Sequence, residues 1–365
     1  MTFGINVFDF GAKGDGISDD TAAIQAAIHF AAKRGGGAIL FPYTKEGYRI
    51  ASTGIETYEG QLVRAQLVIP PGKHNICLMG EMPCRLLNSY HTLPMEVVNK
   101  YSVDWWSRFG TMLCDNTRLF STWNAPEIHD PNEKPWSILA APDGTMWEGK
   151  FSVNQFSISN LEFRVPMDKA KMYPTQSAVN LQRVSRINIE NSQFCLGEQV
   201  GDAVERIFLQ PNPCHTAGLI TSADQNDNNV LHNVAAQGFR YGFVLGEHVV
   251  ADYLYVHNNE EGVVCHDMNH ISMINHIVAQ HNQIILSTTR GPLFGMLPDN
   301  CNLEVGSVDV EPGLPGQEPA VSNIRYGVYD PDNHLRGSLK WSMPPWAGDH
   351  PFPVVGCKNF TVTHF

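Results

Sequence analysis

The chain has few basic residues and no long apolar run. Of its 365 residues, 25 are Lys or Arg and 37 are Asp or Glu, which gives a formal net charge of -12 at pH 7. An acidic chain repels the phosphates of nucleic acids and of anionic lipids, so we expect neither nucleic acid nor a membrane as a partner. No apolar stretch reaches the roughly 20 residues of a membrane-spanning helix. The first residues, MTFGINVFDFG, also lack the basic and apolar regions of a signal peptide. We expect a cytoplasmic protein, or a secreted or virion-associated one whose signal has been removed.

The eight cysteines form no C-x-x-C pair. This absence argues against a zinc knuckle and against a redox dithiol, and eight cysteines in a chain of this length are too sparse for a disulfide scaffold. We expect most of them to be small buried hydrophobes with free thiols.

The stretch FDFGAKGDGISDDTAAIQAAI, residues 8 to 28, has the chemistry of a turn followed by a capped helix. Glycines and Asp15 favour turns, and Asp19, Asp20 or Thr21 can cap the helix that follows. We therefore expect these aspartates to be structural. The helix is predicted over 21–33, before the triple glycine 35–37 and the strand AILFP, and its apolar stripe consists of Ala22, Ile24, Ala27, Ile28 and Ala31.

This order of elements resembles the N-terminal cap of the pectate-lyase-like right-handed parallel β-helix superfamily. The matching motifs are DFGAKGDG, DD, AIQAAI, GGG and FP, all within about residues 5 to 50. The resemblance implies an all-β, right-handed parallel β-helix (a solenoid) with a short N-terminal capping helix. It also implies that the cap identifies the fold and does not carry the chemistry. The superfamily includes carbohydrate-active enzymes and proteins similar to phage tailspikes.

Short β-branched strands repeat every 20 to 25 residues in the middle of the chain, as in the coils of a β-helix. The segment 234–247 aligns with 254–267 at an offset of 20, 218–224 fits at 24, and 284–288 fits at 21. The segments FSISNLEFRV and RINIENSQFCL show similar strands with an Asn at the bend. We expect one domain over 1–365, with 1–50 as cap and first strands, 81–150 as a long loop excursion, 151–310 as central coils and 311–365 as C-terminal coils and tail.

The alignment stacks acidic residues just past one strand of successive coils. Glu247 falls over Asp267, and Asp224 falls within one position of Glu247. Carboxylates this close raise one another's pKa, so one can act as an acid and one as a base, as glycoside hydrolysis requires. We predict Asp267, Glu247 and Asp224 as catalytic residues. The weaker candidates Asp227, Asp252, Glu260 and Glu261 fall in turns.

The residues predicted to bind substrate surround this cluster. His248 and His266 adjoin two of the carboxylates, His270 follows shortly, and Arg240 lies on the strand before Glu247. Tryptophan faces stack on sugar rings, so Trp106 and Trp346 are predicted to wall the cleft.

No metal site is predicted, although the histidines invite one. His266 and His270 have the i, i+4 spacing that chelates zinc on a helix, but the periodicity places them on strands and turns. We therefore predict no cofactor. Calcium held by stacked aspartates is the alternative left open.

The function predicted from these residues is a glycoside hydrolase-like enzyme of polysaccharide degradation. The first alternative is a polysaccharide lyase, which needs a cationic group beside a uronate carboxylate. No Lys occurs between Lys171 and Lys340, which leaves arginines such as Arg240 for that role, and the acidity of the edge disfavours a polyanionic substrate. The polygalacturonase motifs N-T-D and G-H-G are absent. The second alternative is a non-catalytic, glycan-binding tailspike or adhesin. The expected partner is an oligo- or polysaccharide, and a homotrimer is left open because similar proteins form one.

Overall fold

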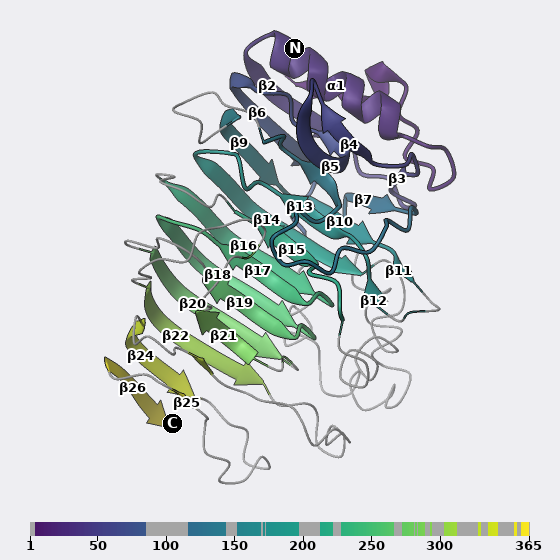
Figure 1. Cartoon of the computed structure of the whole chain (residues 1–365). Helices are drawn as coiled ribbons and strands as arrows, with labels where there is room; N and C mark the ends of the chain where they lie inside the picture. Colours follow the sequence, from purple (N-terminus) through teal and green to yellow (C-terminus); the bar gives the residue numbers. More distant parts are fainter. Residues whose placement is uncertain are drawn as a thin grey trace, which may run out of the picture.

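The protein coils as a parallel β-helix, which Figure 1 shows as a stack of strands below one N-terminal helix. In this computed structural model the described residues are 4–84, 116–143, 152–168, 171, 173–196, 212–221, 228–265, 272–280, 282, 284–288, 293, 303–311, 328–329, 335–341, 354–355 and 359–364. The prediction of an all-β chain with parallel coils and a short capping helix is confirmed.

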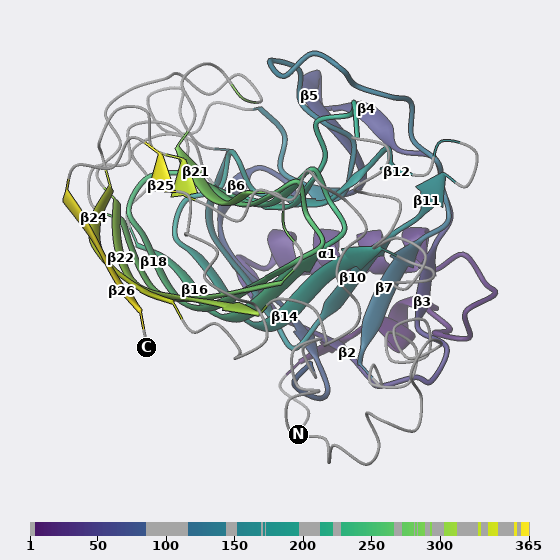
Figure 2. The ribbon, with the colours of Figure 1, turned by 90° about the horizontal axis from the view of Figure 1, so that it is seen from below.

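The first of the two large sheets has fourteen strands, and every printed strand pair in it is parallel. Figure 2, which looks along the stack, shows this sheet as the lower, curved wall, with β7 and β10 on its right. Its strands are β1 (Ile5–Asn6), β2 (Gly36–Phe41), β3 (Tyr48–Ile50), β6 (Gly72–Gly80), β7 (Arg118–Ser121), β9 (Val153–Ser159), β10 (Glu162–Val165), β14 (Ile187–Leu196), β16 (Asn229–Gln237), β18 (Val249–His257), β20 (Ser272–Gln280), β22 (Leu303–Glu311), β24 (Leu335–Trp341) and β26 (Asn359–His364).

The second sheet has ten strands and forms the opposite wall; only its first pair, β4 with β5, is antiparallel. A separate antiparallel pair joins β11 (Met167–Asp168) to β12 (Tyr173–Pro174). The strands of the second sheet are β4 (Ile55–Tyr58), β5 (Gln61–Val68), β8 (Ser137–Ala140), β13 (Ser177–Asn180), β15 (Ala217–Ile220), β17 (Tyr241–Leu245), β19 (Glu261–Cys265), β21 (Ile284–Thr288), β23 (Val328–Tyr329) and β25 (Val354–Val355).

The coil register confirms two of the three predicted offsets. Tyr241 pairs with Glu261, an offset of 20, and Ala217 pairs with Tyr241, an offset of 24. The third offset was wrong: Glu261 pairs with Ile284, which makes it 23 and not 21. The first sheet already has the offset of 23, because Val250 pairs with Met273, so the extra residues lie between β19 and β20, where the strand pattern alone does not fix loop length.

The interior is filled by aliphatic side chains stacked at the same position of successive coils. Because residues in register lie about 4.8 Å apart, each coil buries its apolar residues on those of the next. Burying one such side chain stabilises the fold by about 1.5–3 kcal/mol. One fully buried ladder of the first sheet consists of Leu78, Ile158, Ile189, Leu231, Ala251 and Ile274.

The N-terminal cap closes the first coil with α1 (Thr21–Lys33), which follows the 3-10 helix η1 (Val7–Phe10). Ile24, Ala27, Ile28 and Ala31 are fully buried, as predicted, whereas Ala22 is exposed and was wrongly placed in the stripe. The helix is also fixed to the sheet edge through its polar face: the amide of Gln25 donates to the carbonyl of Val68 at 2.9 Å and accepts from the Val68 amide at 2.7 Å.

The aspartates of the opening motif hold the turn together. Asp20 accepts hydrogen bonds from the backbone amides of Lys13, at 2.6 Å, and Gly14, at 3.1 Å. Burial raises the carboxyl pKa of Asp19, but the hydroxyls of Thr21 and of Ser52, at 2.7 Å, and then the backbone amides of Ala51 and Thr21 donate to it and lower its pKa to about 2. The prediction that these residues are structural agrees with these contacts.

Asparagines shape the bends between the strands. Asn160 and Asn191 adopt positive φ angles of 59° and 46°, which Asn tolerates better than most residues. At the turns before β17 and β19, the buried Asn259 accepts from the amide of Phe239 at 3.0 Å, and the side chain of Asn282 in turn accepts from the amide of Asn259 at 3.0 Å. This ladder fixes the backbone at the start of the strands that carry the site below.

The excursion predicted for 81–150 is interrupted by two strands of the solenoid. β7 pairs with β3 and β10, and β8 pairs with β5 and β13.

Among the described residues, no helix is long and apolar enough to cross a membrane.

Candidate functional site

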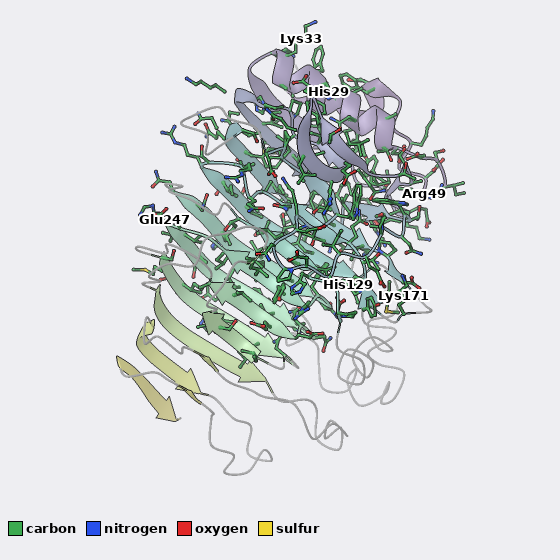
Figure 3. All side chains as sticks on the ribbon, viewed as in Figure 1. His29, Lys33, Arg49, His129, Lys171 and Glu247 are labelled. Carbon is green, nitrogen blue, oxygen red and sulfur yellow. The ribbon has the colours of Figure 1, made fainter. Side chains whose placement is uncertain are left out.

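The predicted carboxylate cluster lies past the end of β17, and the structure describes only part of it. Glu247 is fully buried, and its Oε1 lies 3.6 Å from Nε2 of His248, a residue with a φ of 51°. Figure 3 places Glu247 at the left edge of the stack. Of the other predicted site residues, Arg240 is described and lies just before β17. Six lie outside the described residues: Asp224, Asp267, His266, His270, Trp106 and Trp346.

A different set of polar side chains gathers at the start of β17, which we call the Arg240 site. It comprises His215, Arg240, Tyr241 and Glu260, from three successive coils. Because a strand rises about 3.3 Å per residue, the ends of β17 are about 13 Å apart. The Arg240 site and Glu247 therefore lie at opposite ends of this strand.

The parallel register brings the Arg240 site together. The amide of Tyr241 donates to the carbonyl of Thr216 at 3.0 Å, and the amide of Glu261 donates to the carbonyl of Arg240 at 2.8 Å. These bonds stack the turn at 214–216, the turn at 238–240 and the turn at 258–260 above one another.

A chain of contacts joins guanidinium, imidazole and phenol in this site. Nη1 of Arg240 lies 3.3 Å from Nε2 of His215, and Nδ1 of His215 lies 3.0 Å from Oη of Tyr241. A guanidinium can only donate, so Nε2 must be the accepting nitrogen and Nδ1 must carry the proton that is donated to Tyr241. Geometry thus fixes the tautomer of the imidazole.

Burial keeps the imidazole and the phenol neutral. It lowers the pKa of His215 to about 4, and the nearby charge of Arg240 acts in the same direction. It also raises the pKa of the Tyr241 phenol above its ordinary value, an effect that Arg240 opposes. At neutral pH the pair is therefore a neutral base beside a neutral acid, within reach of a fixed positive charge.

Two carboxyl groups, one in the turn before β19 and one on its first residue, are partly buried. Glu260 accepts a hydrogen bond from the backbone amide of Asn212, and its Oε2 lies 3.6 Å from Nε of Arg240. Burial nevertheless raises the pKa of Glu260 from 4.5 to about 7. Burial also raises the pKa of Glu261, which accepts a hydrogen bond from the hydroxyl of Ser287.

We expect the raised pKa of Glu260 to make stability fall as pH rises. The folded chain holds this proton more tightly than the unfolded chain, so the stabilisation is fully present below about pH 4.5 and is lost as pH rises through about 7. The shift corresponds to at most about 3 kcal/mol. Glu260→Gln should flatten the dependence of unfolding free energy on pH between 4.5 and 7, as measured by urea denaturation. Glu46→Gln, at an exposed residue, is the control. If the unfolding free energy depended on pH equally in both variants, the raised pKa of Glu260 would be contradicted.

A loop from the 116–143 segment lies against the same turns. The amide of His215 donates to the carbonyl of Ile128 at 3.3 Å. Glu127 accepts from the hydroxyl of Tyr173 at 2.7 Å and forms an ion pair with Lys171 at 2.9 Å. His129 and Lys171 lie at the right edge in Figure 3, on the side opposite Glu247.

Sequence reasoning named Arg240 and listed Glu260 among the weaker candidates, but it did not select His215 or Tyr241. The offset of 20 that stacks Glu247 on Asp267 also stacks Arg240 on Glu260, an opposite-charge pair that the alignment contained. The sequence did not point to Glu127 or His129, because their segment lacks the 20- to 25-residue repeat that located the other candidates.

Comparison with known proteins confirms the predicted resemblance. Residues 4–66 match the family model described as rhamnogalacturonase A/epimerase, pectate lyase-like. Curated relatives from Azotobacter vinelandii include Alginate lyase 7, 29% identical over 231 residues that cover 60% of this chain and 24% of that protein. Mannuronan C5-epimerase AlgE1 is 56% identical over 238 residues that cover 63% of this chain and 15% of the epimerase. The chain thus spans about a quarter or less of the length of these relatives.

The solved structures that resemble this fold are distant from the chain in sequence. The tailspike protein of E. coli bacteriophage HK620 in complex with a pentasaccharide has a TM-score of 0.47 and 11% identity, with 99% of this chain and 63% of that chain covered. The A-module of Azotobacter vinelandii mannuronan C-5 epimerase AlgE4 has a TM-score of 0.34 and 15% identity, with 98% and 95% covered.

Proposed function

We propose that the chain removes the proton beside the carboxylate of a uronic acid in a polysaccharide, as a lyase or an epimerase. The observation that carries this proposal is the contact chain from Arg240 through His215 to Tyr241. Abstraction of that proton needs a base, an acid and a cation that neutralises the carboxylate, and these three residues supply one of each. The names of the curated relatives, an alginate lyase and mannuronan epimerases, favour the same reaction class over glycoside hydrolysis.

In this mechanism Arg240 pairs with the substrate carboxylate and releases Nε2 of His215. The freed nitrogen takes the proton from the carbon that bears the carboxylate, and the hydroxyl proton of Tyr241 goes to the product. In a lyase that proton reaches the departing glycosidic oxygen, and in an epimerase it reaches the opposite face of the same carbon. The Nδ1 proton of His215 then passes to Oη of Tyr241, which leaves both groups neutral but the imidazole protonated at Nε2. Loss of the Nε2 proton to water and reprotonation of Nδ1 from water restore the starting tautomer before the next turnover.

We expect a broad pH profile for kcat/KM, which reports the groups of the free enzyme. His215 must be neutral to accept a proton, so activity should rise as pH increases through about 4. Tyr241 must keep its proton, and its raised pKa delays the alkaline fall. Initial rates on mannuronan from pH 3 to 10 test this expectation. An acid limb near the ordinary histidine pKa of about 6.5 would contradict the assignment of His215.

Product analysis on a panel of uronate and neutral glycans tests the reaction class. A lyase releases new reducing ends together with new non-reducing ends that carry the ultraviolet absorbance of an unsaturated uronate. An epimerase changes the uronate composition without new ends. Reducing ends without that absorbance would indicate hydrolysis. Tight binding without turnover on any glycan would indicate an adhesin.

Glycoside hydrolysis at the other end of β17 is the second candidate. It is favoured by the full burial of the Glu247 side chain beside His248, and by the register of 20 that pairs Leu245 with Cys265, two residues before Glu247 and Asp267. Asp224 would be the partner carboxylate. For this candidate, Glu247→Gln should lower the release of reducing ends by about 10²-fold or more. Unchanged release from a folded variant would reject it.

The homotrimer stays a prediction, which light scattering of the purified chain can test.

A further inference from the structure

Three side chains with different ligand atoms converge beside the Arg240 site. Oε2 of Glu127 lies 3.1 Å from Nε2 of His129, and Sγ of Cys214 lies 4.0 Å from Nδ1 of His129. One ligand atom from each residue falls within 4.8 Å of the other two. Only one ring nitrogen of His129 can bind a given metal ion. Tetrahedral zinc, with bonds of about 2.0–2.3 Å, holds its ligand atoms about 3.4–3.7 Å apart, so atoms up to 4.8 Å apart must approach one another by about 1–1.5 Å to complete the geometry.

Backbone and side-chain contacts already orient these ligands. The hydroxyl of Tyr173 donates to Oε1 of Glu127 at 2.7 Å, which leaves Oε2 toward His129. The amide of Cys214 donates to Oδ1 of Asn212 at 2.9 Å, and the thiol is buried. Hydrogen bonds of this type, made to the ligand residues by their neighbours, hold the ligands in place and commonly support metal affinity.

From this geometry we infer that Glu127, His129 and Cys214 bind a zinc ion, with water in the fourth position. A thiolate and an imidazole favour zinc over calcium, which prefers oxygen ligands alone. On binding, the S–H bond of Cys214 breaks, the sulfur lone pair forms the bond to zinc, and the proton passes to solvent. The ion would join the loop at 127–129 to the solenoid turn at 214. This inference does not depend on the proposed uronate chemistry.

Lys171 competes with the metal for the same carboxylate. Its Nζ lies 2.9 Å from Oε1 of Glu127, and its side chain is 43% exposed, so the ammonium can move into water when a cation arrives. Burial also raises the pKa of the Cys214 thiol to about 11, which opposes formation of the thiolate. Both effects weaken binding of the ion, and removing the ammonium should strengthen it.

The test uses the full chain after chelation and dialysis, with Zn²⁺ measured by calorimetry and Co²⁺ measured by its absorption. We expect one equivalent of zinc to bind, and cobalt to give a thiolate charge-transfer band in the near ultraviolet. Zinc should also raise the melting temperature, because it binds the folded chain.

Four variants make the assignment specific. Cys214→Ser should abolish the charge-transfer band and weaken zinc by about 100-fold or more, whereas Cys77→Ser should leave both unchanged. His129→Ala, at a side chain that is 55% exposed and thus safe for folding, should weaken zinc by a similar factor. Lys171→Met should keep the band and bind zinc several-fold more tightly. The inference is overturned if the wild-type chain binds no zinc, or if Cys214→Ser and His129→Ala bind it as well as the wild type.

Discussion

Replacing Tyr241 with Phe should lower turnover of mannuronan by about 10²- to 10⁴-fold, the range expected for loss of a general acid. The substitution removes only the hydroxyl oxygen that lies 3.0 Å from Nδ1 of His215. The Tyr241 side chain is 95% buried, and its apolar contacts with Val244 and Val264 are retained by Phe. We therefore expect a folded protein with a catalytic defect, seen mainly in kcat.

Two measurements separate this defect from a structural one. Thermal unfolding of Tyr241→Phe should stay close to that of the wild type, since one neutral hydrogen bond contributes about 1 kcal/mol. Tyr253→Phe, at a side chain that is 45% exposed on β18, is the matched control and should keep full activity. If Tyr241→Phe retains wild-type kcat, Tyr241 is not the acid and the proposed site is wrong.

Replacing Gly36 with Ala should destabilise the chain by about 3 kcal/mol or more, the second large effect that we expect. Gly36 pairs with Asn75 where β2 meets β6, at a φ of 126°. A Cβ atom there would lie 2.2 Å from the carbonyl oxygen of Asn75, which is backbone and cannot swing away. The first coil would have to open beneath α1.

The neighbouring glycine provides the control for this prediction. Gly35 also has a positive φ, 83°, but a Cβ atom there would meet nothing within 4 Å. Gly35→Ala should therefore cost only about 1–2 kcal/mol, from the strain of a left-handed backbone. Urea denaturation of both variants measures the difference. Equal losses would mean that the close contact with Asn75 does not matter.

The cap could be predicted from sequence because its signals are local. Turn glycines, the aspartates that accept amide hydrogens and the apolar stripe of α1 all lie within a few residues of one another. The offsets of 20 and 24 were equally accessible, since each coil repeats the same buried positions. The third offset failed because the length of the connection between β19 and β20 has no such constraint.

The Arg240 site could be predicted only in part, and the loop that lies against it could not be predicted at all. The register stacks Arg240 on Glu260, but the position of the 127–129 loop depends on hydrogen bonds across more than eighty residues, such as that from His215 to Ile128. Cys214 is buried with a free thiol, as predicted for most of the cysteines, but its place beside His129 and Glu127 had no signal in the sequence.

The most direct test of the uronate chemistry is proton exchange. Mannuronan incubated with the chain in deuterated water, and followed by NMR and ultraviolet absorbance, should either gain deuterium at the carbon that bears the carboxylate or yield an unsaturated uronate. Tyr241→Phe should suppress both signals. New reducing ends with neither deuterium nor unsaturation would contradict proton abstraction and would move the reaction centre to Glu247.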